Sequence, residues 1–218
     1  MPKITSVKPQ KNNPKRFNVF VDGKFSFGAD EDLVVEHRLI ADKELTPEVI
    51  EKLLFEAGVG KLIERIYNLL SFRLRSEKEI RDYLKNLSFK KKVKDQEEIS
   101  ELAVDLLISK LKKKGLIDDE KFTLLWLESR RKSKFKSNTA IKSELMQKGI
   151  DKEIIEKIFS ENEEPQETLA EFALDKKMRI WKNLERVEFK KKALEYLYRL
   201  GFDYDIAKHV IEKKVNLE

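Results

Sequence analysis

Leu145-Met-Gln-Lys-Gly-Ile150 and Leu197-Tyr-Arg-Leu-Gly-Phe202 follow one pattern, in which a leucine is followed by a glycine and then by an apolar residue. After each apolar residue, further apolar pairs recur at offsets of four and five and then of eight and nine residues. A third copy starts at Leu84 and ends in Ser88-Phe89. Nine extra residues displace its apolar pairs, Leu102/Ala103 and Leu106/Leu107. This internal repeat predicts an array of similar helical modules.

The composition agrees with a helical array. Charged residues make up 39% of the 218 residues, whereas glycine and proline are scarce, which is typical of long solvated helices. No apolar run approaches the roughly 20 residues of a membrane span, and the N-terminus lacks the apolar core of a signal peptide. We therefore expect a cytoplasmic protein without a membrane segment. The absence of cysteine excludes disulfides and thiolate metal sites.

Residues 1–57 differ from the repeats. Phe17–Val21 and Lys24–Gly28 alternate apolar and polar residues around Asp22-Gly23, a two-residue turn signal, and so predict a β-hairpin. Ile4–Val7 can add a third strand, with the polar segment Lys8–Lys15 as a connection. We therefore expect a small α+β domain that contains a β-hairpin.

Two helices should follow the strands, over Asp30–Leu39 and Thr46–Phe55. Gly58-Val-Gly-Lys61 then resembles the end of a phosphate-binding loop. A leucine, however, replaces the Ser/Thr that would hold magnesium, and the segment follows a helix instead of a strand. We interpret it as a hinge between residues 1–57 and the array.

The array itself should be mainly α, with three tandem three-helix modules over residues 58–117, 118–165 and 166–218. Ser76-Glu-Lys-Glu79 is a capping box that starts a helix in the first module. Three leucines occupy equivalent positions on the middle helices and should be buried: Leu84, Leu145 and Leu197.

Three segments, in this order and spacing, resemble the signature of the RecX family of bacterial regulators of the RecA recombinase: Arg73-Leu-Arg-Ser-Glu-Lys-Glu-Ile-Arg-Asp-Tyr-Leu84, Gly115-Leu-Ile-Asp-Asp-Glu-Lys-Phe122 and Glu144-Leu-Met-Gln-Lys-Gly-Ile150. Residues 62–215 are similar to the three tandem three-helix modules of that family. Val21-Asp-Gly-Lys-Phe25 resembles part of the extra N-terminal domain of its longer members in Firmicutes-like bacteria. The resemblance implies a regulator that binds the RecA–single-stranded-DNA filament. It also implies inhibition of filament growth, ATPase and strand exchange in recombination, DNA repair and the SOS response.

The net charge of +6 is concentrated in residues 58–117, which hold fifteen Lys/Arg and nine Asp/Glu. Cations of this density suit contacts with phosphates, and a neighbouring aromatic residue such as Phe135 could stack on a base. The candidate contacts with single-stranded DNA or with the filament are Arg73, Arg75, Lys78, Arg81, Lys85, Arg130, Arg131, Lys132, Lys134, Lys136 and Lys142.

The alternative interpretation is that these cations lie on solvated helix faces, where spacings such as Glu77/Arg81 allow ordinary ion pairs. Repeat proteins also use extended surfaces equally well for protein partners. A helical-repeat DNA- or RNA-binding protein without a recombinase partner therefore stays a second hypothesis.

No constellation of nucleophile, base or metal ligands is evident, so we expect no enzymatic activity, no cofactor and no metal. Asp118 or Asp119 is interpreted as a helix N-cap. Trp126 and Trp181 are interpreted as core or module-interface residues. The two histidines, His37 and His209, lie far apart, and neither has neighbours in the sequence that would make it a ligand or a base. We expect a monomer.

Overall fold

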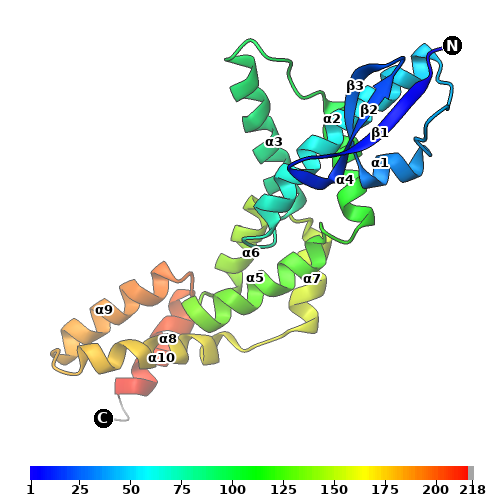
Figure 1. Ribbon diagram of the computed structural model, residues 1–218. Helices are drawn as coiled ribbons and strands as arrows, with labels where there is room; N and C mark the ends of the chain where they lie inside the picture. Colours follow the sequence, from blue (N-terminus) through cyan, green and yellow to red (C-terminus); the bar gives the residue numbers. More distant parts are fainter. Residues whose placement is uncertain (216–218) are drawn as a thin grey trace. The chain divides into compact units, whose positions relative to one another are not determined.

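The computed structural model describes residues 1–215, which form a three-stranded antiparallel sheet followed by ten helices (Figure 1). The mainly α fold with an N-terminal hairpin-containing domain, predicted from the sequence, is confirmed. By its contacts, the chain divides into two compact units. The first comprises residues 1–75 with 80–117, and the second comprises residues 76–79 with the chain from Asp118 onward.

The sheet consists of β1 (Ile4–Gln10), β2 (Asn13–Val21) and β3 (Lys24–Asp30), paired in chain order. The predicted hairpin turns at Asp22 and Gly23, whose φ angles of 48° and 78° suit an Asp-Gly turn. The predicted connection over Lys8–Lys15 is wrong. β1 and β2 continue their pairing as far as Gln10 and Asn13, so most of that segment is strand.

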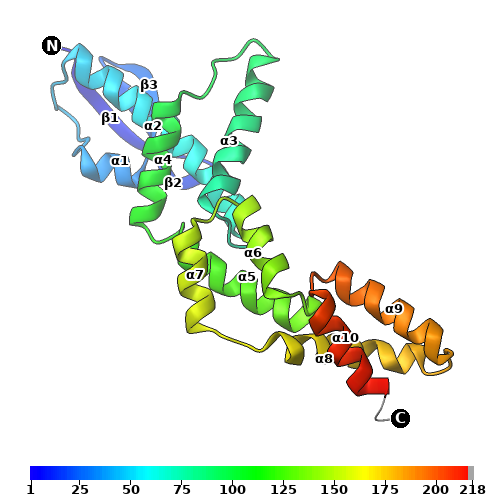
Figure 2. The ribbon, with the colours of Figure 1, turned by 180° about the vertical axis from the view of Figure 1, so that it is seen from behind.

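Two helices cover one face of the sheet. Figure 1 views the sheet from the opposite face, and Figure 2 views it with α2 in front. α1 (Glu31–Glu36) is shorter than predicted and begins at Asp30, whose carboxylate accepts the Leu33 N–H. α2 (Pro47–Leu70) begins after Thr46 and runs without interruption. The predicted hinge at residues 58–61 is therefore wrong, because those residues lie within a helix.

α2 belongs to two cores, and this explains why its glycines do not break it. Up to Ala57 its buried residues pack with the sheet, and from Val59 onward they pack with α3 (Glu77–Lys92) and α4 (Glu101–Lys113). Gly60 permits a close approach, since a Cβ there would lie 2.5 Å from a carboxylate oxygen of Asp30. A helical glycine costs only about 1 kcal/mol, which packing on both halves of α2 offsets.

The first copy of the repeat differs from the prediction. Phe89 is 66% exposed, because α3 continues past it to Lys92. The apolar residue that packs before α4 is instead Ile99, which directly precedes the N-cap Ser100. Offsets of four, eight and nine from Ile99 then lead to three buried residues, Ala103, Leu107 and Ile108. The predicted pairing was one residue out of register, as the 75% exposure of Leu102 shows.

The second unit contains α5 (Asp119–Lys134), α6 (Asn138–Gln147), α7 (Lys152–Glu161), α8 (Gln166–Trp181), α9 (Arg186–Arg199) and α10 (Tyr204–Val215). α5 to α7 share one buried core, and α8 to α10 share another. α6 and α9 end at glycines with positive φ, 76° at Gly149 and 91° at Gly201. The predicted burial of the three repeat leucines is confirmed: Leu84, Leu145 and Leu197 are each 0% exposed.

The predicted helix starts at Ser76 and Asp118 are also confirmed. The Ser76 hydroxyl accepts the Glu79 N–H at 3.2 Å, and the Asp118 carboxylate accepts the Lys121 N–H at 2.9 Å. Trp126 and Trp181 are half-buried beside the two cores of the second unit, as expected. Within residues 1–215, no helix is long and apolar enough to cross a membrane.

Candidate nucleic-acid and protein interface

Cations from α5 and the segment after it converge on one carboxylate. Glu144 of α6 accepts hydrogen bonds from Trp126 Nε1 (2.8 Å), Arg130 Nε (2.7 Å) and Lys136 Nζ. The Arg130 guanidinium also stacks on the Trp126 ring, 3.9 Å from its centroid. Burial raises the pKa of Glu144, but the hydrogen bonds that it accepts outweigh this effect, so its pKa lies below the ordinary value. An internal anion therefore holds two of the predicted contact residues.

Arg131 is largely enclosed, with a side chain that is 11% exposed. Its guanidinium donates to the Asn162 carbonyl at 2.7 Å and to Asn138 Oδ1 at 3.0 Å. Glu164 lies 3.5 Å from its Nε. Burial lowers the pKa of Arg131, while the charge of Glu164 acts in the opposite direction. These contacts fix the end of α5 to the segments beside α6 and α7.

Phe135, the aromatic residue expected near these cations, packs within the protein. It ends α5 in the left-handed conformation, with φ of 50°. Its half-buried ring joins the core of α8 to α10, 6.4 Å from the Phe172 ring and 4.4 Å from Lys176 Nζ. Base stacking at Phe135 is therefore not favoured.

Two lysines of the second cluster are more accessible. Lys132 is 78% exposed and forms an i,i+4 ion pair with Glu128 at 3.2 Å. Lys134 is exposed and makes no ion pair with any residue that the structure describes. An exposed pair such as Lys132–Glu128 contributes only about 0–1 kcal/mol, so phosphates can compete for these two lysines. Lys142 is half-buried and pairs with Glu156 at 2.5 Å.

The first cluster lies on and before α3. In the second unit, Lys78 Nζ donates to the Gln147 carbonyl at 2.9 Å. In the first unit, Arg81 pairs with Asp105 of α4 at 2.8 Å. Arg73 is exposed and donates to the Leu74 carbonyl, whereas Arg75 is half-buried. Lys85 is exposed and makes no ion pair within residues 1–215.

Lys85 lines a cavity of about 530 Å³ between α3 and α4, together with Leu84, Ile99 and Val104. Two further lysines, Lys90 in the last turn of α3 and Lys94 in the loop after it, are exposed and also make no ion pair among the described residues. The candidate contacts predicted from the sequence did not include these two residues, although the lysine run itself was visible there. α3 and the loop after it therefore carry three exposed lysines without an ion pair among the described residues: Lys85, Lys90 and Lys94.

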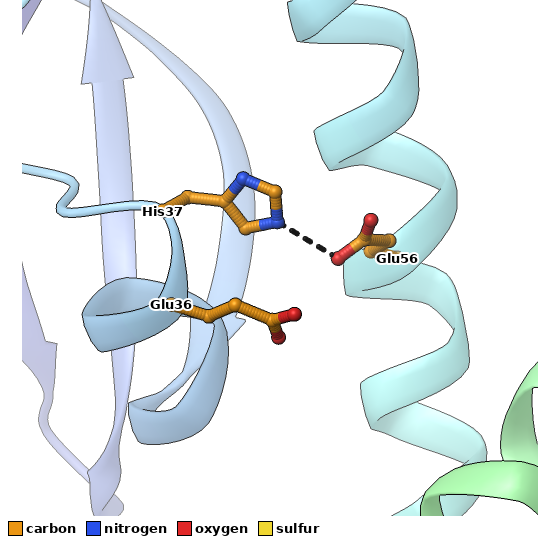
Figure 3. Close-up of side chains that lie close together, drawn as sticks. All are labelled: Glu36, His37 and Glu56. Carbon is orange, nitrogen blue, oxygen red and sulfur yellow. Dashed lines mark hydrogen bonds and ion pairs between the residues drawn. The ribbon is translucent and has the colours of Figure 1, made fainter.

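The structure brings Glu36, His37 and Glu56 together, which the sequence did not suggest (Figure 3). His37 Nε2 lies 3.0 Å from Glu56 Oε2, and Glu56 comes from α2, nineteen residues further along the chain. The expectation that His37 has no cluster of potential ligands around it is therefore wrong. Lys110 Nζ, however, lies 3.6 Å from Glu36 and 4.0 Å from Glu56. This ammonium supplies the positive charge that a metal ion would bring, so an ion-pair network explains the group.

Two family models match the chain: the regulatory protein RecX N-terminal domain over residues 2–46, and the second three-helix domain of RecX over residues 118–157. A regulatory protein RecX of Listeria monocytogenes is 33% identical over 209 residues, which cover 94% of this chain and 73% of the relative. The chain belongs to the RecX family. Another RecX, from Bacillus pumilus, is 32% identical over 216 residues, which cover 98% of this chain and 78% of the relative.

Solved structures of RecX proteins agree with this membership. A crystal structure of regulatory protein RecX matches with a TM-score of 0.72 and 25% identity, over 97% of this chain and 100% of that one. RecX from Lactobacillus salivarius matches with a TM-score of 0.56 and 25% identity, over 71% of this chain and 95% of that one. The RecX resemblance predicted from three short segments and the N-terminal hairpin is therefore confirmed.

Proposed function

We propose that this RecX-family chain binds the RecA–single-stranded-DNA filament and inhibits its growth, its ATPase and strand exchange. The observation that carries the proposal is the similarity to regulatory RecX proteins along 94% of the chain. In this role the chain would act in the cytoplasm, as a monomer without a cofactor and without an enzymatic activity of its own. The processes affected would be recombination, DNA repair and the SOS response.

We also propose four structural modules, over residues 1–57, 58–117, 118–165 and 166–218. The four buried clusters support this division, since the fully buried residues of each one fall within a single module. The half-buried Phe135 packs across the boundary between the last two modules. Modules that bury their own cores can be arranged in series and present side chains to successive sites on an extended partner. A helical filament of repeated protomers is a partner of that kind.

The charges would then divide into two groups. Arg130, Arg131 and Lys136 serve mainly to hold the helices of the second unit, because internal acceptors occupy them. The exposed lysines, which include Lys85, Lys132 and Lys134, would contact phosphates or acidic protein surface. Inhibition would follow from competition for contacts that growing filaments or exchanging strands require.

The proposal is tested by titrating the purified chain into RecA on single-stranded DNA while ATP hydrolysis is measured. We expect RecA turnover to fall, and the chain alone to hydrolyse no ATP. Unchanged turnover at saturating protein, or ATPase activity of the chain alone, would reject the proposed function.

The second hypothesis, a helical-repeat DNA- or RNA-binding protein without a recombinase partner, rests on the unpaired lysines of α3 and the loop after it. Parallel titrations with bare oligonucleotide, RecA alone and the assembled filament separate the two. Tighter binding to the filament than to bare DNA supports the first hypothesis. Equal affinities, with no binding to RecA alone, support the second.

A further inference from the structure

The N-terminal domain, residues 1–57, separates its charges by structural element. Residues 1–30, which form the sheet, hold six Lys/Arg and two aspartates. Residues 31–57, which form α1 and the first half of α2, hold three Lys/Arg and eight Asp/Glu. The total charge of the domain is therefore near zero, but its sheet is cationic and its helical layer is acidic. Such a surface attracts anionic partners to its sheet side.

The two aspartates of the sheet are already engaged with the backbone. The Asp22 carboxylate accepts the Lys3 N–H at 2.9 Å, and the Asp30 carboxylate accepts the Leu33 N–H at 2.8 Å. Four exposed lysines of the same strands and turns make no ion pair with any residue that the structure describes: Lys8, Lys11, Lys15 and Lys24. Their charges are available to a ligand.

Within residues 1–117, α1 and α2 pack on one face of the sheet and no helix covers the other face (Figures 1 and 2). Strand pairing sets Phe20 opposite Ser6 and Phe25, and it sets Lys8 opposite Asn18. Because side chains alternate along a strand, these five residues share one face, which we call the aromatic face. The other face carries the residues that pack with α1 and α2: Val7, Val19 and Phe27. Figure 1 views the sheet from the aromatic face.

The aromatic face exposes a phenyl ring beside an unpaired cation. Phe25, on the edge strand β3, is 59% exposed, and its ring meets the Phe20 ring edge to face at a centroid distance of 6.0 Å. Lys8 Nζ lies 5.8 Å from the Phe20 centroid. The Phe20 contact orients the Phe25 ring, and the exposed part of that ring is open to a flat ligand.

We propose that the aromatic face binds single-stranded nucleic acid, with a base stacked on Phe25 and a backbone phosphate near Lys8. Rings of this kind bind single strands because every base has a π face, whereas the bases of a duplex are stacked on one another. The site goes beyond the function proposed above, since it lies outside the helical array and needs no RecA. The N-terminal domain would thus bind the single-stranded nucleic acid directly.

Fluorescence anisotropy of the full-length chain with labelled oligothymidylate, without RecA, tests the site. Phe25→Ala should weaken binding by about fivefold or more. Phe25→Trp should retain or strengthen it, whereas Phe25→Leu, which keeps apolar area but loses the π face, should weaken it like alanine. Lys8→Ala should lower the salt slope by roughly 0.7, because one phosphate is then no longer neutralised.

Two matched controls lie in the acidic part of the same domain. Ile40, 65% exposed, controls for loss of an exposed apolar side chain, and Lys52, 66% exposed, controls for loss of a lysine. Ile40→Ala and Lys52→Ala should bind as the wild type does. The inference is overturned if the chain does not bind bare oligonucleotide, or if Phe25→Ala binds like Ile40→Ala.

The outcome also separates this inference from the RecA proposal. If Phe25→Ala weakens filament binding but leaves bare-DNA binding unchanged, the face contacts protein and the inference is wrong. If Phe25→Ala weakens bare-DNA binding while the wild-type chain leaves RecA ATPase unchanged, the inference stands and the proposed function fails.

Discussion

The Ser137 hydroxyl donates a hydrogen bond of 2.7 Å to the carbonyl of Gly201, 64 residues further along the chain. The same hydroxyl accepts the Ala140 N–H and so caps α6. Ser76, the N-cap of α3, repeats the arrangement by donating to the Lys148 carbonyl at the end of α6, at 2.8 Å. Both serines are buried. A capping serine on one middle helix therefore binds the end of the next middle helix, and we call this contact the seryl joint.

The first prediction concerns the glycine in the seryl joint. Gly201 has a φ of 91°, and a Cβ there would lie 2.6 Å from the Ala140 Cβ and 2.7 Å from the Ser137 Oγ. Gly201→Ala should destabilise the second unit by more than about 1–2 kcal/mol, because the left-handed conformation alone has that cost. Urea denaturation measures the change.

Gly58→Ala is the matched control for that substitution. Gly58 is exposed in the middle of α2, and a Cβ there would meet nothing within 4 Å. Alanine should stabilise the chain by up to about 1 kcal/mol, since it favours helix more than glycine does. If the two substitutions had the same effect, the close packing at Gly201 would be absent in solution.

The second prediction separates capping from the seryl joint. Ser137→Ala removes a cap and also leaves the half-buried Gly201 carbonyl without its donor. Ser100→Ala removes only a cap, since the exposed Ser100 binds the Ala103 N–H within α4. Loss of a cap costs about 1 kcal/mol, and an acceptor left without its donor adds up to about 1–3 kcal/mol, depending on its burial. Equal losses in denaturation would show that the joint adds no stability.

Local pattern was sufficient to predict the buried leucines of the repeat but not the connections between helices. Leu145 and Leu197 lie on continuous helical periods, so the repeat located their burial correctly. Phe89 has the same spacing, but α3 continues through it, because Lys90 and its neighbours are good helix formers and nothing there ends the helix. No spacing rule could identify Ile99 as the residue that packs in its place.

For the candidate site, too, the sequence pattern did not reveal which residues would come into contact. A basic cluster such as residues 130–136 is visible in the sequence, but its partners are not. Glu144 and Asn162 approach the cluster only when α6 and α7 pack on α5. Likewise Glu56 meets His37 through the packing of α2. Whether a cation is structural or available to a ligand is decided by tertiary contacts.

The third prediction concerns two cations of the same cluster. Arg131→Ala should destabilise the second unit by about 2–4 kcal/mol, because it leaves the Asn162 carbonyl and Glu164 without their partner and removes a packed side chain. Lys134→Ala should change stability by less than about 0.5 kcal/mol. It should nevertheless weaken single-stranded DNA binding and lower its salt slope by roughly 0.7 if Lys134 contacts a phosphate. Thermal denaturation and DNA-binding anisotropy, measured on both variants, show which cation stabilises the fold and which one contacts DNA.

The fourth prediction follows from the lowered pKa of Glu144. A carboxyl group whose pKa is lower in the folded state stabilises the fold above its unfolded pKa of about 4.5, and this contribution is lost as the pH falls through the folded value. Glu144→Gln should therefore be less stable than the wild type at pH 7, by about 1–2 kcal/mol. The difference should shrink as the pH falls below about 4.5. Glu128→Gln, in an exposed pair with Lys132, is the control and should change the stability at pH 7 by no more than about 1 kcal/mol.

The last prediction tests the modules themselves. Leu145 is fully buried in the core of α5 to α7, and its carbonyl accepts the Ile150 N–H that closes the end of α6. Leu145→Ala should cost about 2–5 kcal/mol, which is a large part of what a small core provides. Amide exchange should then show lost protection between about residues 122 and 159, with protection retained in α2 and in α8 to α10. Filament binding should fail as well, because the folded module between the outer ones would be lost, although no proposed contact residue has changed. Uniform loss of protection across the chain would instead show that it unfolds as one cooperative body, and the modular interpretation would be wrong.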